Sequence, residues 1–324
     1  MIRSIKNHVA AGAILALSGF ATCANAETVL QLASVETPTT VWGQVAHKFA
    51  DGVAEASGGE LNVELALSGS TGTVRETLEA LTIGTNDIVM TVVASLNSYD
   101  PLAAIESYPY LIRDEDHFNA VYNGEIGNDL FDALAQSSGL RLVGAGSRGP
   151  REMASKRAIN SVEDLEGLKI RVPGIDVFRE TWAGLGASPT PMSSKEVYTG
   201  LQSGIIDAVE NPLSAHIRSK YYEAAEYVIL THHVYGAYTF VFDDARFQSL
   251  TDAERAIINE QAKIAFEWGT EQAKAELADL RAELEGHGAK FIEPDIAGFR
   301  AKLAPMADKF SELAPWVARI QAAE

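Results

Sequence analysis

The sequence predicts an α/β fold built of two lobes, with one helix long enough to run along both of them. Strands and helices alternate over residues 28–94, and a second series of the same kind covers residues 140–211. Such alternation is typical of lobes whose strands are largely parallel. A helical pattern then continues from Thr251 to Glu285, and some 35 residues at about 1.5 Å each make a helix of about 50 Å. That length exceeds the diameter of one small domain.

The first series begins the first lobe. Strands are expected at residues 28–33, 61–67 and 87–94, with helices at 39–57 and 73–81 between them. In the first helix apolar residues recur at every fourth position from Val41 to Val53, which gives the helix one apolar face, and Gly58-Gly59 ends it. The last strand, DIVMTVVA, is apolar almost throughout, as expected for a buried strand.

The second series makes the second lobe. Strands are expected at residues 140–145, 168–172 and 205–209, with helices at 176–186 and 193–203, and a further strand at 237–242 could return to the first lobe. Thr251 and Glu254 form a capping box that opens the long helix. The expected boundaries are residues 27–148 with 237–276 for lobe 1, and residues 149–236 with 277–324 for lobe 2.

The N-terminus has the pattern of a signal peptide. Arg3 and Lys6 precede an apolar run at residues 9–21, and Ala24-Asn25-Ala26 has the small residues of a signal-peptidase site. We expect cleavage after Ala26 and export of the remaining 298 residues. The only cysteine, Cys23, leaves with the signal peptide, so the exported protein has no disulfide, thiolate metal site or cysteine nucleophile.

The charge of the chain limits its partners. The net charge is −18, and it becomes −20 when Arg3 and Lys6 are removed. A strongly acidic protein is a poor partner for nucleic acids and for anionic membrane surfaces. An anionic ligand would therefore need a local positive site that acts against the overall field.

Motifs for cofactors, metals and catalysis are weak. Gly144-x-Gly146-x-x-Gly149 resembles a dinucleotide fingerprint, but Pro150 and Arg151 follow where an apolar helix should begin. His232 and His233 are adjacent, so on a strand they point to opposite faces and do not readily share a metal. Neither HExxH nor Gly-x-Ser-x-Gly occurs. No cofactor or metal is expected, and the protein is not expected to be an enzyme.

Two arginines and an asparagine are the candidate binding residues. Arg171 lies in the apolar strand Ile170-Arg171-Val172, Arg151 lies twenty residues earlier, and Asn211 precedes Pro212. Arginine holds a carboxylate in two parallel hydrogen bonds, and an amide both donates and accepts. For Arg171 two interpretations stay open: a buried structural salt bridge, or a guanidinium that awaits a ligand carboxylate. Arg148 lies close enough to serve in place of Arg151.

These residues stand within motifs that resemble the solute-binding proteins of TRAP (tripartite ATP-independent periplasmic) transporters. The motifs keep the family's mutual spacing, and they are Arg157-Ala-Ile-Asn-Ser, Gly167-Leu-Lys-Ile-Arg-Val-Pro, Gly186-Ala-Ser-Pro-Thr-Pro-Met, Glu196-Val-Tyr, Leu201-Gln-x-Gly-x-x-Asp and Glu210-Asn-Pro. The resemblance covers essentially all of the exported chain. It implies a two-lobed periplasmic binding protein fold, capture of an organic acid between the lobes, and delivery to a membrane permease with a small and a large subunit.

The resemblance also implies roles for single residues. Arg171 matches the arginine that clamps the ligand carboxylate, Arg151 matches a second site arginine, and Asn211 matches an assisting asparagine. Arg75 matches a further arginine near the site of sialate-binding relatives. The chain departs from those relatives at Val92, where they have an acidic residue, and at Ser194, where they have an aromatic one. Sialic acid is therefore not the expected ligand.

The remaining candidates bear on the identity of the acid. Arg148 is an extra cation that suggests a second acidic group or a phosphate, whereas Glu36 and Ser95 stand at strand ends and are suited to hydroxyl groups. Together they favour a sugar acid such as a uronate or an aldonate. A dicarboxylate, a keto acid, a phosphorylated acid, a sensory role and a secreted sugar-acid enzyme remain as alternatives. The protein is expected to act in the periplasm as a monomer.

Overall fold

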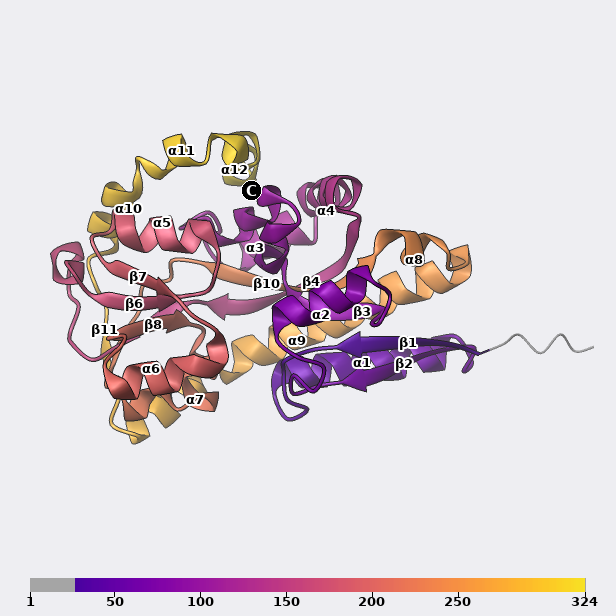
Figure 1. Cartoon of the computed structure of the whole chain (residues 1–324), viewed down its shortest axis with the longest axis horizontal. Helices are drawn as coiled ribbons and strands as arrows, with labels where there is room; N and C mark the ends of the chain where they lie inside the picture. The colour runs from indigo at the N-terminus through magenta and orange to yellow at the C-terminus, as the bar shows by residue number, and fades with distance from the viewer. Residues whose placement is uncertain (1–26, 324) are drawn as a thin grey trace, which may run out of the picture.

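The computed structural model describes residues 27–323, so the predicted signal peptide lies outside the described residues. Two α/β lobes, each built around one sheet, lie side by side (Figure 1). None of the helices in residues 27–323 combines the length and the apolar character needed to cross a membrane.

The sheet of lobe 1 has five strands. Their order is β2 (Leu61–Ala66), β1 (Thr28–Ala33), β3 (Ile88–Val92), β10 (Tyr235–Asp243) and β4 (Leu140–Pro150). β2, β1 and β3 are parallel, and β10 is antiparallel to both of its neighbours. The carboxyl ends of β1, β2, β3 and β4 therefore lie at the same edge of the sheet.

The sheet of lobe 2 has six strands. Their order is β11 (Lys290–Ile292), β9 (Tyr227–Ile229), β5 (Glu152–Ser155), β8 (Ala208–Asn211), β6 (Lys169–Val172) and β7 (Ser188–Pro191). β8, β6 and β7 are parallel, and β5 is antiparallel to β8 and β9. The carboxyl ends of β6, β7 and β8 therefore meet the beginning of β5 at one edge.

Helices cover both sheets. Those of lobe 1 are α1 (Val41–Ala56), α2 (Val74–Thr82), α3 (Glu115–Tyr122), α4 (Glu125–Ser138) and α8 (Asp244–Gln248), with 3₁₀ turns η1 (Val93–Ser98) and η2 (Pro101–Ser107). Those of lobe 2 are α5 (Asp176–Gly184), α6 (Val197–Ser203), α7 (Leu213–Arg218), α10 (Ile296–Leu303) and α11 (Met306–Lys309), with 3₁₀ turns η3 (Val162–Leu165), η4 (Ser194–Glu196) and η5 (Tyr221–Glu223).

The long helix α9 (Asp252–Gly286) runs along both lobes, from α8 toward α7 (Figure 1). Thr251 and Glu254 form the predicted capping box at its start. Its first half packs on α1 and β4, with Ile258 and Phe266 completely buried, and Leu284 near its end packs against α7 in lobe 2. The predicted helix is confirmed with nearly the expected bounds.

β4 runs to Pro150, although the sequence indicated a strand that stops at residue 145. Its pairing with β10 includes two register shifts, and these let the strand continue past two glycines. A Cβ atom on Gly146 would lie 2.7 Å from Phe266, and one on Gly144 would lie 2.8 Å from the same ring. The glycines of the apparent dinucleotide motif therefore allow α9 to pack closely on β4.

The chain crosses between the lobes at β4–β5, at β9–β10 and along α9. The C-terminal segment crosses as well: α12 (Ala314–Gln321), which follows η6 (Ser311–Leu313), packs by α3 of lobe 1, where His117 Nε2 donates to the Ile320 carbonyl over 3.0 Å. An apolar cluster continues from Phe118 in lobe 1 to Trp182 in lobe 2. The predicted lobe boundaries, 27–148 with 237–276 and 149–236 with 277–324, stay a prediction.

Candidate functional site

The topology of lobe 2 brings the three main candidates to one edge of the sheet. Arg171 lies in β6 next to its carboxyl end, Asn211 is the last residue of β8, and Arg151 directly precedes β5. In open α/β sheets the carboxyl ends of parallel strands form the usual ligand crevice. The edge therefore places two cations and an amide where a ligand can reach the sheet.

Arg151 is held by a carboxylate. Its Nη2 donates to Glu210 Oε1 over 2.8 Å and to the Glu210 carbonyl over 3.0 Å, and its Nε pairs with Oε2 of the same carboxylate. Both side chains are buried, and Nε2 of His233 lies 3.1 Å from Glu210 Oε2. Burial alone would raise the pKa of Glu210, but Arg151 and His233 outweigh it and lower that pKa to about 2. The two groups are therefore charged, and each neutralises the other.

Arg171 is buried without such a carboxylate. Its Nε and Nη2 donate to the carbonyl of Met192 over 2.9 and 2.7 Å, and no carboxylate of residues 27–323 lies within ion-pair distance of it. The side chain is only 5% exposed, and burial lowers its pKa. A guanidinium carries five N–H groups, so Nη1 and one proton of Nη2 are left for another acceptor. Arg171 therefore does not form the buried structural salt bridge that was one of its two interpretations. Arg151 forms such a bridge, with Glu210.

Asn211 and His216 complete the surroundings of this edge. Asn211 is half-buried, and within the described chain its side-chain amide has no hydrogen-bond partner. His216, on α7, is 1% exposed, and neither of its ring nitrogens has a hydrogen-bond partner in the described chain. Burial lowers the pKa of His216 to about 4, with the Glu210 carboxylate opposing the shift. The imidazole is therefore neutral at pH 7.

Aromatic residues of α5 pack against Arg151 and His233. The centre of the Phe178 ring lies 5.0 Å from the guanidinium carbon of Arg151, and the centres of the Trp182 and His233 rings lie 5.1 Å apart. Both aromatic side chains are buried, so this face of the helix belongs to the core. The contacts fix the position of Arg151 and His233 rather than leaving a stacking platform open.

Glu36 and Ser95 lie at the carboxyl edge of the lobe 1 sheet, as predicted. Glu36 is 2% exposed and accepts from the Tyr238 hydroxyl over 2.5 Å and from the Thr40 hydroxyl over 3.2 Å. It also pairs with Arg218 of α7 over 2.5 Å, so it joins the two lobes. The hydroxyl of Ser95 lies 3.0 Å from that of Thr91. Within the described chain the Ser95 hydroxyl has this one partner and can form another hydrogen bond, whereas both oxygens of Glu36 are engaged.

The other two predicted arginines belong to elements of lobe 1. The side chain of Arg75, on α2, is 82% exposed and lies 3.8 Å from Glu79. Arg148, near the end of β4, places its guanidinium carbon 4.5 Å from the centre of the Tyr238 ring. The predicted roles of Arg75 and Arg148 in binding the ligand therefore stay predictions.

The two histidines of the adjacent pair have separate partners. His232 pairs with Glu152 over 2.5 Å, and His233 contacts Glu210 and the Thr231 hydroxyl. Within residues 27–323 no group of His, Cys, Asp and Glu side chains has the arrangement of a metal site.

The end of β4, at the carboxyl edge of the lobe 1 sheet, leads directly to Arg151 at the edge of the lobe 2 sheet. Both edges therefore face the region between the lobes. On the far side a Cβ atom on Gly69, in the loop after β2, would lie 3.7 Å from Nζ of Lys195 in η4. The lobes therefore meet at Gly69–Lys195 as well as at Glu36–Arg218. Two α/β lobes with a buried, carboxylate-free arginine at the edge between them define a two-lobed solute-binding protein.

Comparison with known proteins agrees with this class. A family model described as bacterial extracellular solute-binding protein, family 7 (DctP), matches residues 32–313, and the chain belongs to this family. The sialic acid-binding periplasmic protein SiaP of Vibrio cholerae is 32% identical over 298 residues, which cover 92% of each chain.

Solved structures give the same result. A TRAP periplasmic solute-binding protein of Roseobacter denitrificans with bound L-galactonate has a TM-score of 0.85 at 31% identity and covers 91% of this chain and 99% of its own. One from Xanthobacter autotrophicus with bound β-D-galacturonate has a TM-score of 0.86 at 28% identity and covers 91% and 100%. The predicted fold and the predicted membership in the TRAP solute-binding proteins are confirmed.

Several important residues were missed by the sequence analysis. Glu210 was noted only as part of a motif, yet it neutralises Arg151. His216 and Arg218 gave no signal, because their significance depends on how α7 packs against both lobes. An acidic residue within the apolar strand Ala208–Asn211 was the available clue, since a buried carboxylate requires a cation.

Proposed function

We propose that this protein captures a small sugar acid, such as an aldonate or a uronate, in the periplasm and delivers it to the small and large subunits of a TRAP permease. It acts by binding and release and catalyses no reaction. The observation that carries the proposal is Arg171, a buried guanidinium that has no carboxylate within the described chain and keeps donors free.

The remaining donors of Arg171 suit a ligand carboxylate. Because Nε is bonded to Met192, the carboxylate would bind end-on, to Nη1 and the second proton of Nη2. Such charge-assisted bonds are about twice as strong as neutral ones. The Asn211 amide would orient the acid, and Ser95 would bond to a hydroxyl on the lobe 1 side.

The relatives support the chemical class of the ligand. The two solved structures described above hold L-galactonate and β-D-galacturonate, both of which carry one carboxylate and several hydroxyl groups. A ligand held by Arg171 on lobe 2 and by Ser95 on lobe 1 would bind the closed arrangement of lobes better than an open one. It would thereby shift the population toward closure by that difference in affinity.

Calorimetric titration tests the proposal. The panel consists of galactonate, galacturonate, glucuronate, succinate, pyruvate and a sugar phosphate. A sugar acid is expected to bind most tightly, and Arg171→Met is expected to weaken its binding by about two to three decades. The matched control is Arg179→Met, which removes an exposed arginine that pairs with Asp176 in the same lobe.

Two outcomes would overturn the proposal. Unchanged affinity in a folded Arg171→Met protein would remove this arginine from the site, and turnover of any acid in the panel would show an enzyme. Delivery is tested separately by reconstituting the permease subunits in vesicles, where sugar-acid uptake should depend on the added binding protein.

A further inference from the structure

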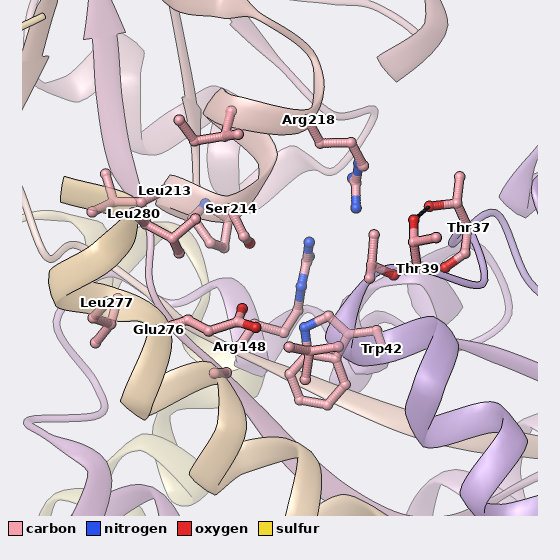
Figure 2. Close-up of a pocket in the computed structure, with 15 residues that line it drawn as sticks. Thr37, Thr39, Trp42, Arg148, Leu213, Ser214, Arg218, Glu276, Leu277 and Leu280 are labelled. Carbon is pink, nitrogen blue, oxygen red and sulfur yellow. Dashed lines mark hydrogen bonds between the residues drawn. The ribbon is translucent and has the colours of Figure 1, made fainter. Parts of the chain in front are cut away.

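A pocket of about 290 Å³ lies at the junction of the two lobes. It is lined by the residues before and at the start of α1, by the end of β4, by α7 and by the second half of α9, and we call it the junction pocket (Figure 2). Its volume is close to the lower limit of pockets that hold small ligands, which is roughly 300 Å³.

Two arginines from different lobes reach into the junction pocket. Figure 2 shows the guanidinium groups of Arg148, from lobe 1, and Arg218, from lobe 2, pointing toward one another. Nε of Arg148 is buried without a hydrogen-bond partner in the described chain, and no carboxylate there lies within ion-pair distance of Arg148. Arg218 uses Nη1 for Glu36. Two facing cations with unused donors form a suitable site for an anion.

The carboxylates around the pocket leave Arg148 without an ion pair. Glu36 is already engaged by Tyr238, Thr40 and Arg218. Glu276 lies on the α9 wall, where burial and the neighbouring Asp279 raise its pKa, and it forms no ion pair with Arg148. A second negative charge on a ligand would face Glu276, so a monoanion fits better than a dianion.

The junction pocket is distinct from the edge that holds Arg171. Neither Arg151, Arg171 nor Asn211 lines it. Arg151 is bonded to Glu210 and Arg171 to Met192, whereas Arg148 and Glu36 are joined through Tyr238. The two groups of arginines therefore have different hydrogen-bonding and aromatic partners, although the buried Glu106 carboxylate is influenced by the charges of both Arg148 and Arg151.

We propose that the junction pocket binds a small monocarboxylate in addition to the acid of the proposed function. Its carboxylate lies between Arg148 and Arg218, and its carbon skeleton packs against Leu213, Leu277 and Trp42. Because these groups come from both lobes and from α9, a ligand in the junction pocket stabilises this arrangement of the lobes relative to any in which the pocket is pulled apart.

Fluorine NMR of protein labelled with 5-fluorotryptophan tests the proposal, because Trp42 lines the junction pocket and Trp182 lies in the core of lobe 2. The titration uses butyrate in the Arg171→Met background, with sodium chloride at equal ionic strength and inorganic phosphate as comparisons. The Trp42 resonance, assigned with Trp42→Phe, should shift saturably, with a dissociation constant of about 1–10 mM for butyrate and weaker binding of phosphate.

Two variants and one control make the result specific. Arg148→Met removes the guanidinium over the Tyr238 ring and leaves an unbranched apolar side chain in its place, and it should weaken the butyrate response at least about tenfold, which corresponds to about 1.4 kcal/mol. Ser214→Phe fills the pocket without changing its charge and should abolish the response, so the test does not depend on the folding of one variant. Arg179→Met should have no effect.

The proposal fails if butyrate gives no saturable Trp42 shift, if chloride gives the same shift, or if both pocket variants respond like the parent protein. These outcomes are independent of the proposed function, because the background already lacks Arg171 and sugar-acid binding is measured by calorimetry in a protein that keeps it.

Discussion

Arg151 and Arg171 stand at the same edge of the lobe 2 sheet, and their exposures are only 7% and 5%, yet their surroundings differ. Arg151 is paired with the buried Glu210, which His233 also contacts, whereas Arg171 donates to a backbone carbonyl. Burial would lower the pKa of Arg151, but Glu210 reverses this and raises it, while for Arg171 burial prevails and its pKa is lowered. Residue type and burial are therefore the same for the two arginines, and the partner of each guanidinium decides its role.

The largest expected effect is on stability, and it separates the two arginines directly. Arg151→Met leaves the Glu210 carboxylate buried without its main cation and should destabilise the protein by about 3–5 kcal/mol. Arg171→Met leaves no buried carboxylate unpaired and should change the free energy of unfolding by less than about 1 kcal/mol. Urea unfolding of both ligand-free variants measures the difference. Equal losses would mean that Arg171 is as structural as Arg151.

The next largest effect is the pH dependence of stability that is caused by the titration of His216. The pKa of His216 is lowered to about 4 in the folded protein, whereas an unfolded histidine titrates near about 6.5. The unfolded chain therefore binds the proton first, and the stability present above about pH 6.5 should fall by roughly 3 kcal/mol as the pH drops to about 4.

The variant His216→Phe should remove this part of the pH dependence, because no proton is then taken up at position 216. Urea midpoints at several pH values give the slope, and exposed His47, replaced by Gln, serves as the control. A slope that is the same in the His216 variant and the parent would show that the histidine is protonated equally in both states.

The smallest effect concerns the lobe 1 side of the site. Arg75 is largely exposed, and its contact with Glu79 is long, so such a surface pair contributes only about 0–1 kcal/mol. If the guanidinium stays in solvent when ligand binds, Arg75→Ala should change sugar-acid affinity by less than about threefold. A loss of a decade or more would place Arg75 at the ligand, as the family resemblance implied.

The sequence was most informative where local rules decide the structure. Thr40, Thr73 and Thr251 cap the helices that periodicity predicted. Parallel pairing of β6 with β8 brings Arg171 and Asn211 to one edge, and antiparallel pairing of β5 with β8 brings Arg151 there. The predicted end of β4 was wrong by five residues, because the strand continues past Gly144 and Gly146 through two register shifts in its pairing with β10.

Long-range contacts explain what the sequence could not predict. Glu36 has the position of a hydroxyl-binding residue, but Arg218 lies 182 residues away in the chain and engages it. Glu210 neutralises Arg151 only because β5 and β8 are adjacent in the sheet. Neither pair leaves a trace in the spacing of residues, since each depends on how distant elements pack.

The long helix α9 has a practical consequence for measuring how the lobes move. A continuous helix of 35 residues keeps its length when neighbouring elements shift, so exposed positions such as Asp252 and Glu285 stay about 50 Å apart. A pair of fluorescent dyes at these positions would therefore give a constant signal. The protein thus contains its own ruler, against which the changing distance between dyes placed on α2 and α6 can be calibrated.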